Sequence, residues 1–363
     1  MILAGGMDMG RVTVMHTAGL HLGTTFRGVP PEIGRQRRRD LMQTLTRITE
    51  MCRQRQTDIL LIAGNLWENQ HITRPQVDFV ADQFRRIPST TIVIAPGSSD
   101  AFYQESFYRH YPWPDNVHIF QGAGISSIWF SHLNLRVFGC GWTGAEPPQD
   151  LDWSQVQPDS GSQVMVIAHG TPETLKIPSR LLDMDHIAYI ALGGNHSHKI
   201  WSRRVLDPGS PEPLSISDVG AKGVLVGNIG ASTSLELQQL GSRHVHKITM
   251  DIGQYSSQAE ILSAVQAAIS DRNRDLFHLV LKGMRPQGSW DLAALREELK
   301  DVFYLWLEDN TDSNIDLGSL ATEHNKGVVG KYITAIQESQ LSSDIRKLAL
   351  DYGLDALLTG GDS

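Results

Sequence analysis

His-Thr-Ala-Gly-Leu-His-Leu-Gly, residues 16–23, follows the short apolar run Val12–Met15 and is the first of five polar blocks in the chain. The other four also come directly after apolar runs rich in β-branched residues. They are Ile-Ala-Gly-Asn-Leu-Trp (62–67), Ala-Pro-Gly-Ser-Ser-Asp (95–100), Ile-Ala-His-Gly (167–170) and Ala-Leu-Gly-Gly-Asn-His-Ser-His-Lys (191–199). Such runs predict buried strands, so each block is expected at a strand end. The pattern therefore gathers histidines and small polar residues at one edge of a sheet.

Strand and helix patterns alternate around the first blocks. Ile59–Ala63 and Thr91–Ala95 are continuous buried-strand patterns, and a helical apolar period runs from about Arg35 to Gln54. Thr73 with Pro75 marks the start of a second helix that ends near residue 86, since proline suits the first helical turn. Such alternation predicts parallel strands joined by right-handed crossovers. After residue 115 the pattern becomes strand-rich, which predicts two packed sheets flanked by helices.

The composition changes near residue 245. From there the chain reads strand, helix, strand, helix, strand, with no metal-binding residue types at the strand ends. The last fifty residues are helical in pattern, with an interruption near Ser342. We therefore predict a main domain over 11–244, a small α/β cap domain over 245–314 and a C-terminal helical extension over 315–363. In the extension, Ile345, Leu348, Leu350, Leu354 and Leu357 either dock a partner or pack back on the chain.

Composition excludes several classes of protein. Of 363 residues, 40% are hydrophobic and 20% are charged, which is ordinary for a globular chain. No apolar run approaches the length of a membrane span, and the first ten residues lack the basic start of a signal peptide. Two cysteines argue against a disulfide scaffold and fit a reducing compartment. We expect a cytoplasmic protein with no membrane association.

Charge gives little support for a dedicated nucleic-acid binder, because the net charge is -8. One basic cluster stands out, and its members are Arg35, Arg37, Arg38 and Arg39. These arginines are candidate phosphate contacts. The alternative is that they form the solvated first turns of a helix, since arginine is a good helix former.

The order and spacing of the five blocks resemble the calcineurin-like metallophosphoesterases, and most of all the SbcD-type DNA-repair exonucleases of the YhaO-like branch. That family reads Asp-x-His, Gly-Asp, Gly-Asn-His-Asp, a lone His and Gly-His-x-His, each at a strand end. Asp207–Leu214, Gly220–Val224 and Ala349–Leu357 are similar to later segments of the family, so the resemblance extends from about residue 11 to the end. It implies an α/β fold: a two-sheet sandwich flanked by helices, with a small α/β cap domain and C-terminal helices.

Several histidines match metal ligands of the family. His21 matches the histidine of the first block, and His169 matches the lone histidine of the fourth. The fifth block allows two alignments. Without a gap, His196 is the second ligand and Gly194 replaces the first. With two inserted residues, His196 and His198 are both ligands; this reading is slightly preferred, because Lys199 then follows as in the exonucleases. His16, just before the first block motif, reads as a structural core residue.

Four positions that carry a ligand or a catalytic group in the family have changed here. They are Gly19 for the first aspartate, Asn65 for the bridging aspartate, Ser98 for the asparagine ligand and Ser99 for the acid–base histidine. Asparagine has one carbonyl oxygen and no charge, so it bridges two cations poorly. A serine hydroxyl titrates too far from neutrality to replace a general acid. Asp100 matches an acidic position that is not a direct ligand in the family.

The remaining imidazoles favour one zinc ion, or another borderline metal, over a manganese pair. The candidate ligands of one zinc or manganese ion are His21, Asn65, His169, His196 and His198. The competing interpretation is that no metal binds and that these histidines pack in a shallow cleft. Both interpretations remain open at this point.

Three functional hypotheses follow from the sequence. The first is a catalytically degenerate homologue in DNA repair or DNA processing, with a scaffold role or a role in binding DNA or a partner. The second is an active metal-dependent phosphodiesterase or exonuclease with a reduced, histidine-rich site. The third is a protein-interaction module that uses the cap and the C-terminal helices without contacting DNA. By resemblance, the expected partners are an SbcC-type coiled-coil ABC ATPase, DNA and a second copy of the chain.

Overall fold

The computed structural model describes residues 10–359, except 158–160, 183, 185, 231, 287–289, 313–316, 325 and 326. In the last helix it does not describe the side chains of 344, 347, 348, 351, 352, 355, 358 and 359. Residues 1–9, on which the expectation of no signal peptide rests, lie outside the described residues. Within the described part, no helix combines the length and the apolar character needed to cross a membrane.

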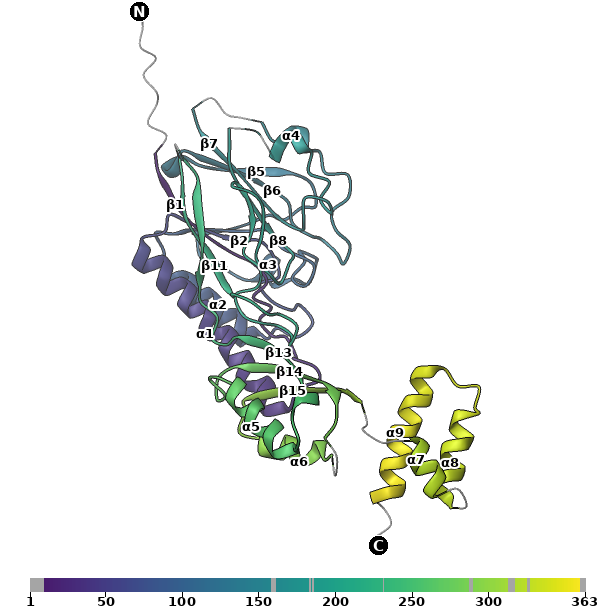
Figure 1. The fold of residues 1–363 in the computed structure, drawn as a ribbon. Coiled ribbons are helices and arrows are strands. Elements are labelled where there is room, and N and C mark those ends of the chain that lie inside the picture. The colour runs from purple at the N-terminus through teal and green to yellow at the C-terminus, as the bar shows by residue number, and fades with distance from the viewer. Residues whose placement is uncertain are drawn as a thin grey trace, which may run out of the picture. The chain divides into compact units, whose positions relative to one another are not determined.

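The first sheet carries the first three motif blocks. Its strand order is β12 (Ser234–Gln239), β11 (Gly223–Ile229), β1 (Val12–Thr17), β2 (Ile59–Ile62), β3 (Thr91–Ile94) and β4 (Val117–Ile119). The strands β1 to β4 are parallel, whereas β11 is antiparallel to both β1 and β12. The carboxyl ends of β1, β2 and β3 therefore lie at one edge, as the sequence predicts (Figure 1).

The second sheet carries the last two blocks. Its order is β5 (Ser126–Phe130), β6 (Leu135–Gly139), β7 (Gln163–His169), β8 (Ile187–Gly193), β10 (Val205–Asp207) and β9 (Lys199–Ser202). β6, β7, β8 and β10 are parallel, and the edge strands β5 and β9 are antiparallel to their neighbours. The short helix α4 (Ser179–Leu182) connects β7 with β8, and another short helix, α3 (Phe107–His110), lies between β3 and β4 of the first sheet.

Side chains that alternate along each strand point to opposite faces of the sheet and join different apolar layers. In β2, Leu60 and Ile62 belong to the apolar cluster shared with the helices, whereas Ile59 and Leu61 belong to the cluster between the two sheets. Ile167 of β7 joins the same inter-sheet cluster. A third cluster covers the outer face of the second sheet. The chain thus forms the two-sheet sandwich flanked by helices that the sequence predicts.

Two long helices cover the first sheet (Figure 1). α1 (Pro31–Arg55) begins four residues before the expected Arg35, because Pro31 occupies its first position and Glu32 favours the positive helix start. α2 (Arg74–Arg85) begins where predicted, with the side chains of Thr73 and Gln76 forming a capping box.

A three-stranded sheet follows the sandwich along the chain, in the order β13 (Val245–Asp251), β14 (Leu276–Met284) and β15 (Tyr304–Asp312). Helices α5 (Gln258–Ala268) and α6 (Leu292–Glu298) lie in its connections, so the predicted strand–helix–strand–helix–strand order is confirmed.

Three helices end the described chain: α7 (Leu317–Glu323), α8 (Val328–Gln337) and α9 (Ser343–Thr359). The predicted interruption near Ser342 separates α8 from α9. Leu350 and Leu354 are buried in an apolar cluster with Ile333 of α8, whereas Ile345 is 53% exposed. The side chain of Leu348 lies outside the described residues.

The contacts divide the chain into two compact units. The first extends to His246 and also includes Asp271–Phe277 and Val302–Tyr304, and the second comprises Lys247–Ser270, His278–Asp301 and the chain from Leu305 onward. The strands of the three-stranded sheet thus begin in the first unit and continue in the second. A separate domain over 315–363 stays a prediction.

Candidate metal centre

The first two motif blocks extend the pairing of β1 with β2 beyond the strand ends. The N–H of Gly19 donates to the carbonyl oxygen of Gly64 at 3.0 Å, and the N–H of His21 donates to that of Asn65 at 2.8 Å. His21 and Asn65 both adopt left-handed backbone conformations, with φ of 48° and 54°. Such conformations are costly for residues other than glycine and turn the chain sharply. The two side chains are thereby brought together above the sheet edge.

A chain of hydrogen bonds links these side chains to a carboxylate. Nδ1 of His21 lies 2.5 Å from Oε1 of Glu68, and Nε2 of His21 lies 3.5 Å from Nδ2 of Asn65. Oδ1 of Asn65 accepts the N–H of Ser99 at 2.9 Å. These bonds are mutually consistent if His21 carries its proton on Nδ1, donates it to Glu68 and accepts the Asn65 amide at Nε2. Both ends of the Asn65 amide are therefore engaged within the protein.

Glu68 is the member of this network that motif analysis missed. It lies one residue beyond the second block, at a position where the family places no ligand. The hydrogen bond from His21 lowers the pKa of Glu68 below its usual value, although partial burial opposes the shift. Its spacing of three residues from Asn65, in a turn after a strand, was a signal that could have placed it at the site. The centre thus contains a carboxylate, but one bound to a histidine.

Asp100 holds the second and third blocks together. Its side chain is fully buried and accepts four hydrogen bonds. The donors are the backbone N–H groups of Asn65 (2.9 Å), Leu66 (2.7 Å) and Gly97 (2.6 Å) and the hydroxyl of Tyr108 (2.7 Å). Each carboxylate oxygen thus has two donors, and Asp100 acts as a structural clamp. Ser98 is exposed and Ser99 is half-buried in the same loop.

His169 lies in a narrow space between two glycines. A Cβ atom on Gly64 would come within 2.5 Å of Nδ1 of His169, and one on Gly97 would come within 2.7 Å of its Cγ. Nδ1 of His169 lies 3.0 Å from the carbonyl oxygen of Ala63, which it bonds as a donor. Burial lowers the pKa of His169, so the ring is neutral near pH 7. The same hypothetical Cβ on Gly97 would also touch Asn65, which places His169 beside that side chain.

The fifth block places one of its two histidines beside His21. The rings of His196 and His21 have centroids 5.9 Å apart, and Nδ1 of His196 lies 3.3 Å from Oδ2 of Asp218. The hydrogen bond with Asp218 raises the pKa of His196. His198 instead bonds the carbonyl oxygen of Asp207 through Nδ1, at 2.6 Å. The structure therefore brings together His21, Asn65, His169 and His196, whereas no contact joins His198 to them among the described residues.

His16 is a core residue, as the sequence predicts. It is fully buried, and its Nδ1 lies 2.8 Å from the hydroxyl of Tyr189 on the facing sheet. Burial lowers the pKa of His16 to about 3. Its ring therefore stays neutral in the native state and serves packing between the sheets.

The basic cluster on α1 is not uniformly exposed. Arg37 is 4% exposed, lies over the ring of Phe26 at 4.0 Å and donates a hydrogen bond to the carbonyl of Pro213. Burial lowers the pKa of Arg37 to about 10. Its guanidinium is thus used inside the fold, whereas Arg35 and Arg39 are exposed and Arg38 is half-buried.

Neighbouring charged residues continue this arrangement; we call Arg37, Asp40, Arg47, Glu212 and Arg243 the α1 charge network. Nε of Arg243 lies 2.6 Å from Oδ2 of Asp40, and both side chains are nearly buried. Glu212 accepts the hydroxyl of Thr44 at 2.5 Å and lies 3.5 Å from Arg47. These pairs bind helix α1 to loops more than 160 residues away in the sequence.

We call His21, Asn65, Glu68, Asp100, His169 and His196 the motif centre. A bridged pair of cations does not fit these residues. Gly19 and Asn65 supply no charge, Glu68 is bound to His21, and Asp100 is saturated by four donors. In the described part of the chain, no three His, Cys, Asp or Glu side chains are grouped to hold a metal ion. The residues give some support for a single metal ion. In His169 and His196, Nδ1 is bonded to an oxygen atom, so Nε2 is the nitrogen left to bind a metal.

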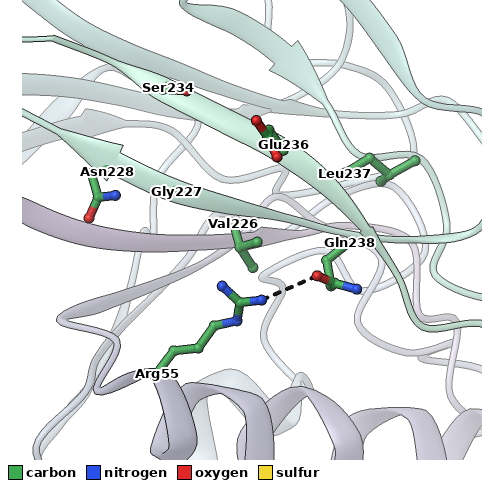
Figure 2. A pocket seen from close by; sticks show the side chains of 8 residues that line it. All are labelled: Arg55, Val226, Gly227, Asn228, Ser234, Glu236, Leu237 and Gln238. Carbon is green, nitrogen blue, oxygen red and sulfur yellow. Dashed lines mark hydrogen bonds between the residues drawn. The ribbon is translucent and has the colours of Figure 1, made fainter.

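A pocket of about 280 Å³ lies elsewhere, between the end of α1 and the β11–β12 hairpin. Figure 2 shows Arg55 pointing toward Gln238, whose Oε1 lies 3.2 Å from Nη2 of the arginine. Asn228, Ser234 and Glu236 also line this pocket, and none of the motif residues does.

Comparisons with known proteins find a metallophosphoesterase among the relatives of the chain. The chain is 22% identical over 345 residues to an uncharacterized metallophosphoesterase, YhaO, of Bacillus subtilis (strain 168), and the match covers 85% of this chain and 84% of the relative. No family model matches the sequence. The crystal structure of TT1561 of Thermus thermophilus is similar over 61% of this chain and 99% of its own, with a TM-score of 0.35 and 10% identity, which is too distant to bear on function. The YhaO relative and the two-sheet sandwich together support membership of the metallophosphoesterase superfamily.

Proposed function

We propose that this chain is an SbcD-like phosphoesterase-fold protein that has lost catalysis and acts in DNA repair or DNA processing as a scaffold that binds DNA or a protein partner. The observation that carries the proposal is the hydrogen bonding of Asn65. The side chain at the bridging position spans from Nε2 of His21 to the N–H of Ser99.

The exchange of a carboxylate for an amide explains how the centre is stable without a cation. A carboxylate at position 65 has only acceptors, so it needs a metal or another donor to face His21. The amide supplies a donor to His21 and an acceptor to Ser99, which satisfies both neighbours. Loss of the general acid at Ser99 alone costs about 10²–10⁴-fold in rate. Two-metal hydrolysis also needs the bridging charge that Asn65 lacks.

A nuclease assay tests the proposal directly. Labelled single-stranded and duplex DNA are incubated with Mn²⁺ and either the wild-type protein or His169→Ala. We expect the same background rate for both proteins, because the wild type has no catalytic centre to lose. Manganese-dependent cleavage by the wild type that disappears in His169→Ala would contradict the proposal.

The second candidate is a hydrolase with a single, imidazole-bound zinc or manganese ion. One observation favours it. Nδ1 of His169 and Nδ1 of His196 are each bonded to an oxygen acceptor, and histidines that bind a metal through Nε2 are oriented by such a bond. Calorimetric zinc titration of the wild type, of His169→Ala and His196→Ala, and of His110→Ala as an exposed control tests it. One equivalent of zinc lost only in the first two variants supports this candidate, and equal binding by all four proteins contradicts it.

For partner binding we propose that α7–α9 act as the docking element, with an SbcC-type ATPase or a second copy of the chain as the expected occupants. The apolar cluster that Ile333, Leu350 and Leu354 form within these helices supports this proposal, since it requires no other part of the chain. Truncation after Asp312 tests it. We expect the remaining protein to unfold at an unchanged temperature; a loss of several kcal/mol would indicate that the helices complete a core.

A further inference from the structure

The three-stranded sheet has one face that is covered by helices. Along β14, Leu279 and Leu281 are fully buried, and Leu307 of β15 is 8% exposed. Successive side chains of a strand point to opposite faces, so Leu279 and Leu281 share one face. The helices α5 and α6 supply the matching apolar residues, and the buried ones are Ile261, Val265 and Leu295.

The intervening residues form the other face of the sheet. Nε2 of His278 lies 2.8 Å from Oε2 of Glu308, so these two side chains share a face. The rings of His246 and Phe277 stack with centroids 5.0 Å apart, so the residues that follow them, Lys247 and His278, share the opposite face. By alternation, Lys282 and Trp306 also belong to it. We call this the open face; it includes Lys247, His278, Lys282, Trp306 and Glu308, and alternation also places Thr249, Val280, Asn310 and Asp312 on it.

The open face offers an aromatic ring and cationic side chains to solvent. Trp306 is 48% exposed, which is unusual for a residue of this size. Lys282 is exposed on the central strand β14, and Lys247 is exposed on β13, the edge strand opposite to that of Trp306. The negative charge of Glu308 is partly offset by the bonded His278 and by Lys247. An exposed ring and two ammonium groups on one face of a sheet are complementary to an extended ligand with flat aromatic groups and a negatively charged backbone.

We propose that the open face binds single-stranded nucleic acid, with a base stacked on Trp306 and the phosphates held by Lys247 and Lys282. Every base has a π face, so stacking on an exposed ring requires no particular sequence. A duplex hides its base faces within its own stack, so the open face is expected to prefer single strands. This inference specifies the DNA-binding role proposed above, and it does not depend on the chemistry of the motif centre.

The chain supplies a matched control for Trp306. Trp129, on the edge strand β5, is 43% exposed, but the guanidinium of Arg136 lies over its ring at 5.4 Å. One face of the Trp129 ring is therefore already occupied, and Trp129 is not on the open face. Trp129→Ala removes an exposed tryptophan of similar exposure without altering the proposed site.

Fluorescence anisotropy on the full chain tests the proposal, with a labelled oligothymidylate of about 20 nucleotides in EDTA, so that binding is measured without cleavage. Trp306→Ala is expected to weaken binding roughly 5- to 100-fold, because base–aromatic stacking is worth about 1–3 kcal/mol per base. Lys247→Ala with Lys282→Ala is expected to flatten the slope of log affinity against log salt by roughly 0.7 for each phosphate contact. Trp129→Ala should bind as the wild type does.

Four results would overturn the assignment. They are no binding by the wild type, equal affinity of the wild type and Trp306→Ala, an equal loss in Trp129→Ala, and tighter binding of a matched duplex. Thermal unfolding of each variant verifies that the fold is intact, which is expected because both tryptophans are exposed. Metal-dependent cleavage in the separate nuclease assay would contradict the proposal that catalysis is lost. It would not contradict nucleic-acid binding by the open face.

Discussion

The motif centre and the α1 charge network lie in the same unit and are both built from polar side chains, yet they satisfy those side chains differently. In the α1 charge network, full charges remain and pair with one another, as Arg243 does with Asp40 at 2.6 Å. At the motif centre, the carboxylates of Glu68 and Asp100 are bonded to a histidine ring, a hydroxyl and backbone N–H groups, and the amide of Asn65 joins His21 to Ser99. Carboxylates therefore meet guanidinium groups in the α1 charge network, whereas at the motif centre they meet a histidine or hydrogen-bond donors without a full charge.

The largest expected effect comes from breaking the charge network. Asp40→Ala leaves the guanidinium of Arg243 nearly buried without its partner, and loss of one member of a buried pair costs about 3–5 kcal/mol. Urea unfolding measures the change. Lys300→Ala is the control, since its pair with Glu297 is exposed and exposed pairs contribute little to stability. Similar losses in both variants would show that burial does not distinguish these ion pairs.

The next largest effect tests the clamp beneath the motif centre. Asp100→Asn keeps the size of the side chain but replaces one carboxylate oxygen with an NH₂ group. This donor then faces backbone N–H groups that donate to Asp100 in the wild type. We expect a loss of about 3 kcal/mol in the free energy of unfolding, because hydrogen bonds to a buried charge are strong. Stability within about 0.5 kcal/mol of the wild type would contradict the structural role of Asp100.

Acid should lower the free energy of unfolding, because His16 is buried as a neutral ring. His16 has a native pKa lowered to about 3 by burial, whereas an unfolded histidine titrates near 6.5. The unfolded chain therefore binds more protons between these values, so stability is lost as pH falls below about 6.5. The loss between pH 7 and pH 5 is about 2 kcal/mol. His16→Phe should remove that part of the pH dependence in urea unfolding, and an unchanged profile would refute the assignment.

The smallest expected effect comes from placing a carboxylic acid at position 65 of the motif centre. Asn65→Asp removes the donor to Nε2 of His21, and we expect a loss of about 1 kcal/mol without metal. Added Mn²⁺ or Zn²⁺ should raise the unfolding temperature of this variant more than that of the wild type, since a ligand of the native state stabilises it. Asn134→Asp is the control, because Asn134 has a similar left-handed backbone on an exposed turn. An equal response to metal in both variants would disprove a local effect.

The sequence predicted the sandwich well, because its central strands are continuous apolar runs that are buried on both faces. The strands β9 and β10 were missed, since Lys199–Ser202 is mixed in character and Val205–Asp207 has only three residues. They pair with each other, and β10 also pairs with β8, so the sheet holds strands that have no strong pattern of their own. The start of α1 was placed late because its first turn, Pro-Glu-Ile-Gly, contains a glycine and only one large apolar residue.

The site was predicted in part. The approach of Asn65 to His21 follows from the parallel pairing of β1 with β2, which brings adjacent strand ends together. The role of Glu68 does not follow from any motif, because it depends on the left-handed turn at Asn65 that directs the chain back toward His21. The burial of Arg37 depends on Phe26 and on Pro213, which is distant along the chain. Contacts of this kind are set by tertiary packing.

Gly64 and Gly97 limit which positions around His169 can be changed. A Cβ atom at either position would come within 2.7 Å of the His169 ring, so neither position accepts a side chain while the ring stays where it is. At Gly19, a Cβ atom would meet its nearest neighbour, Ser210, at an ordinary 3.5 Å, and aspartate tolerates the left-handed backbone found there. A protein engineer who wants to add a carboxylate to this centre would therefore place it at position 19 or 65 and leave Gly64 and Gly97 unchanged.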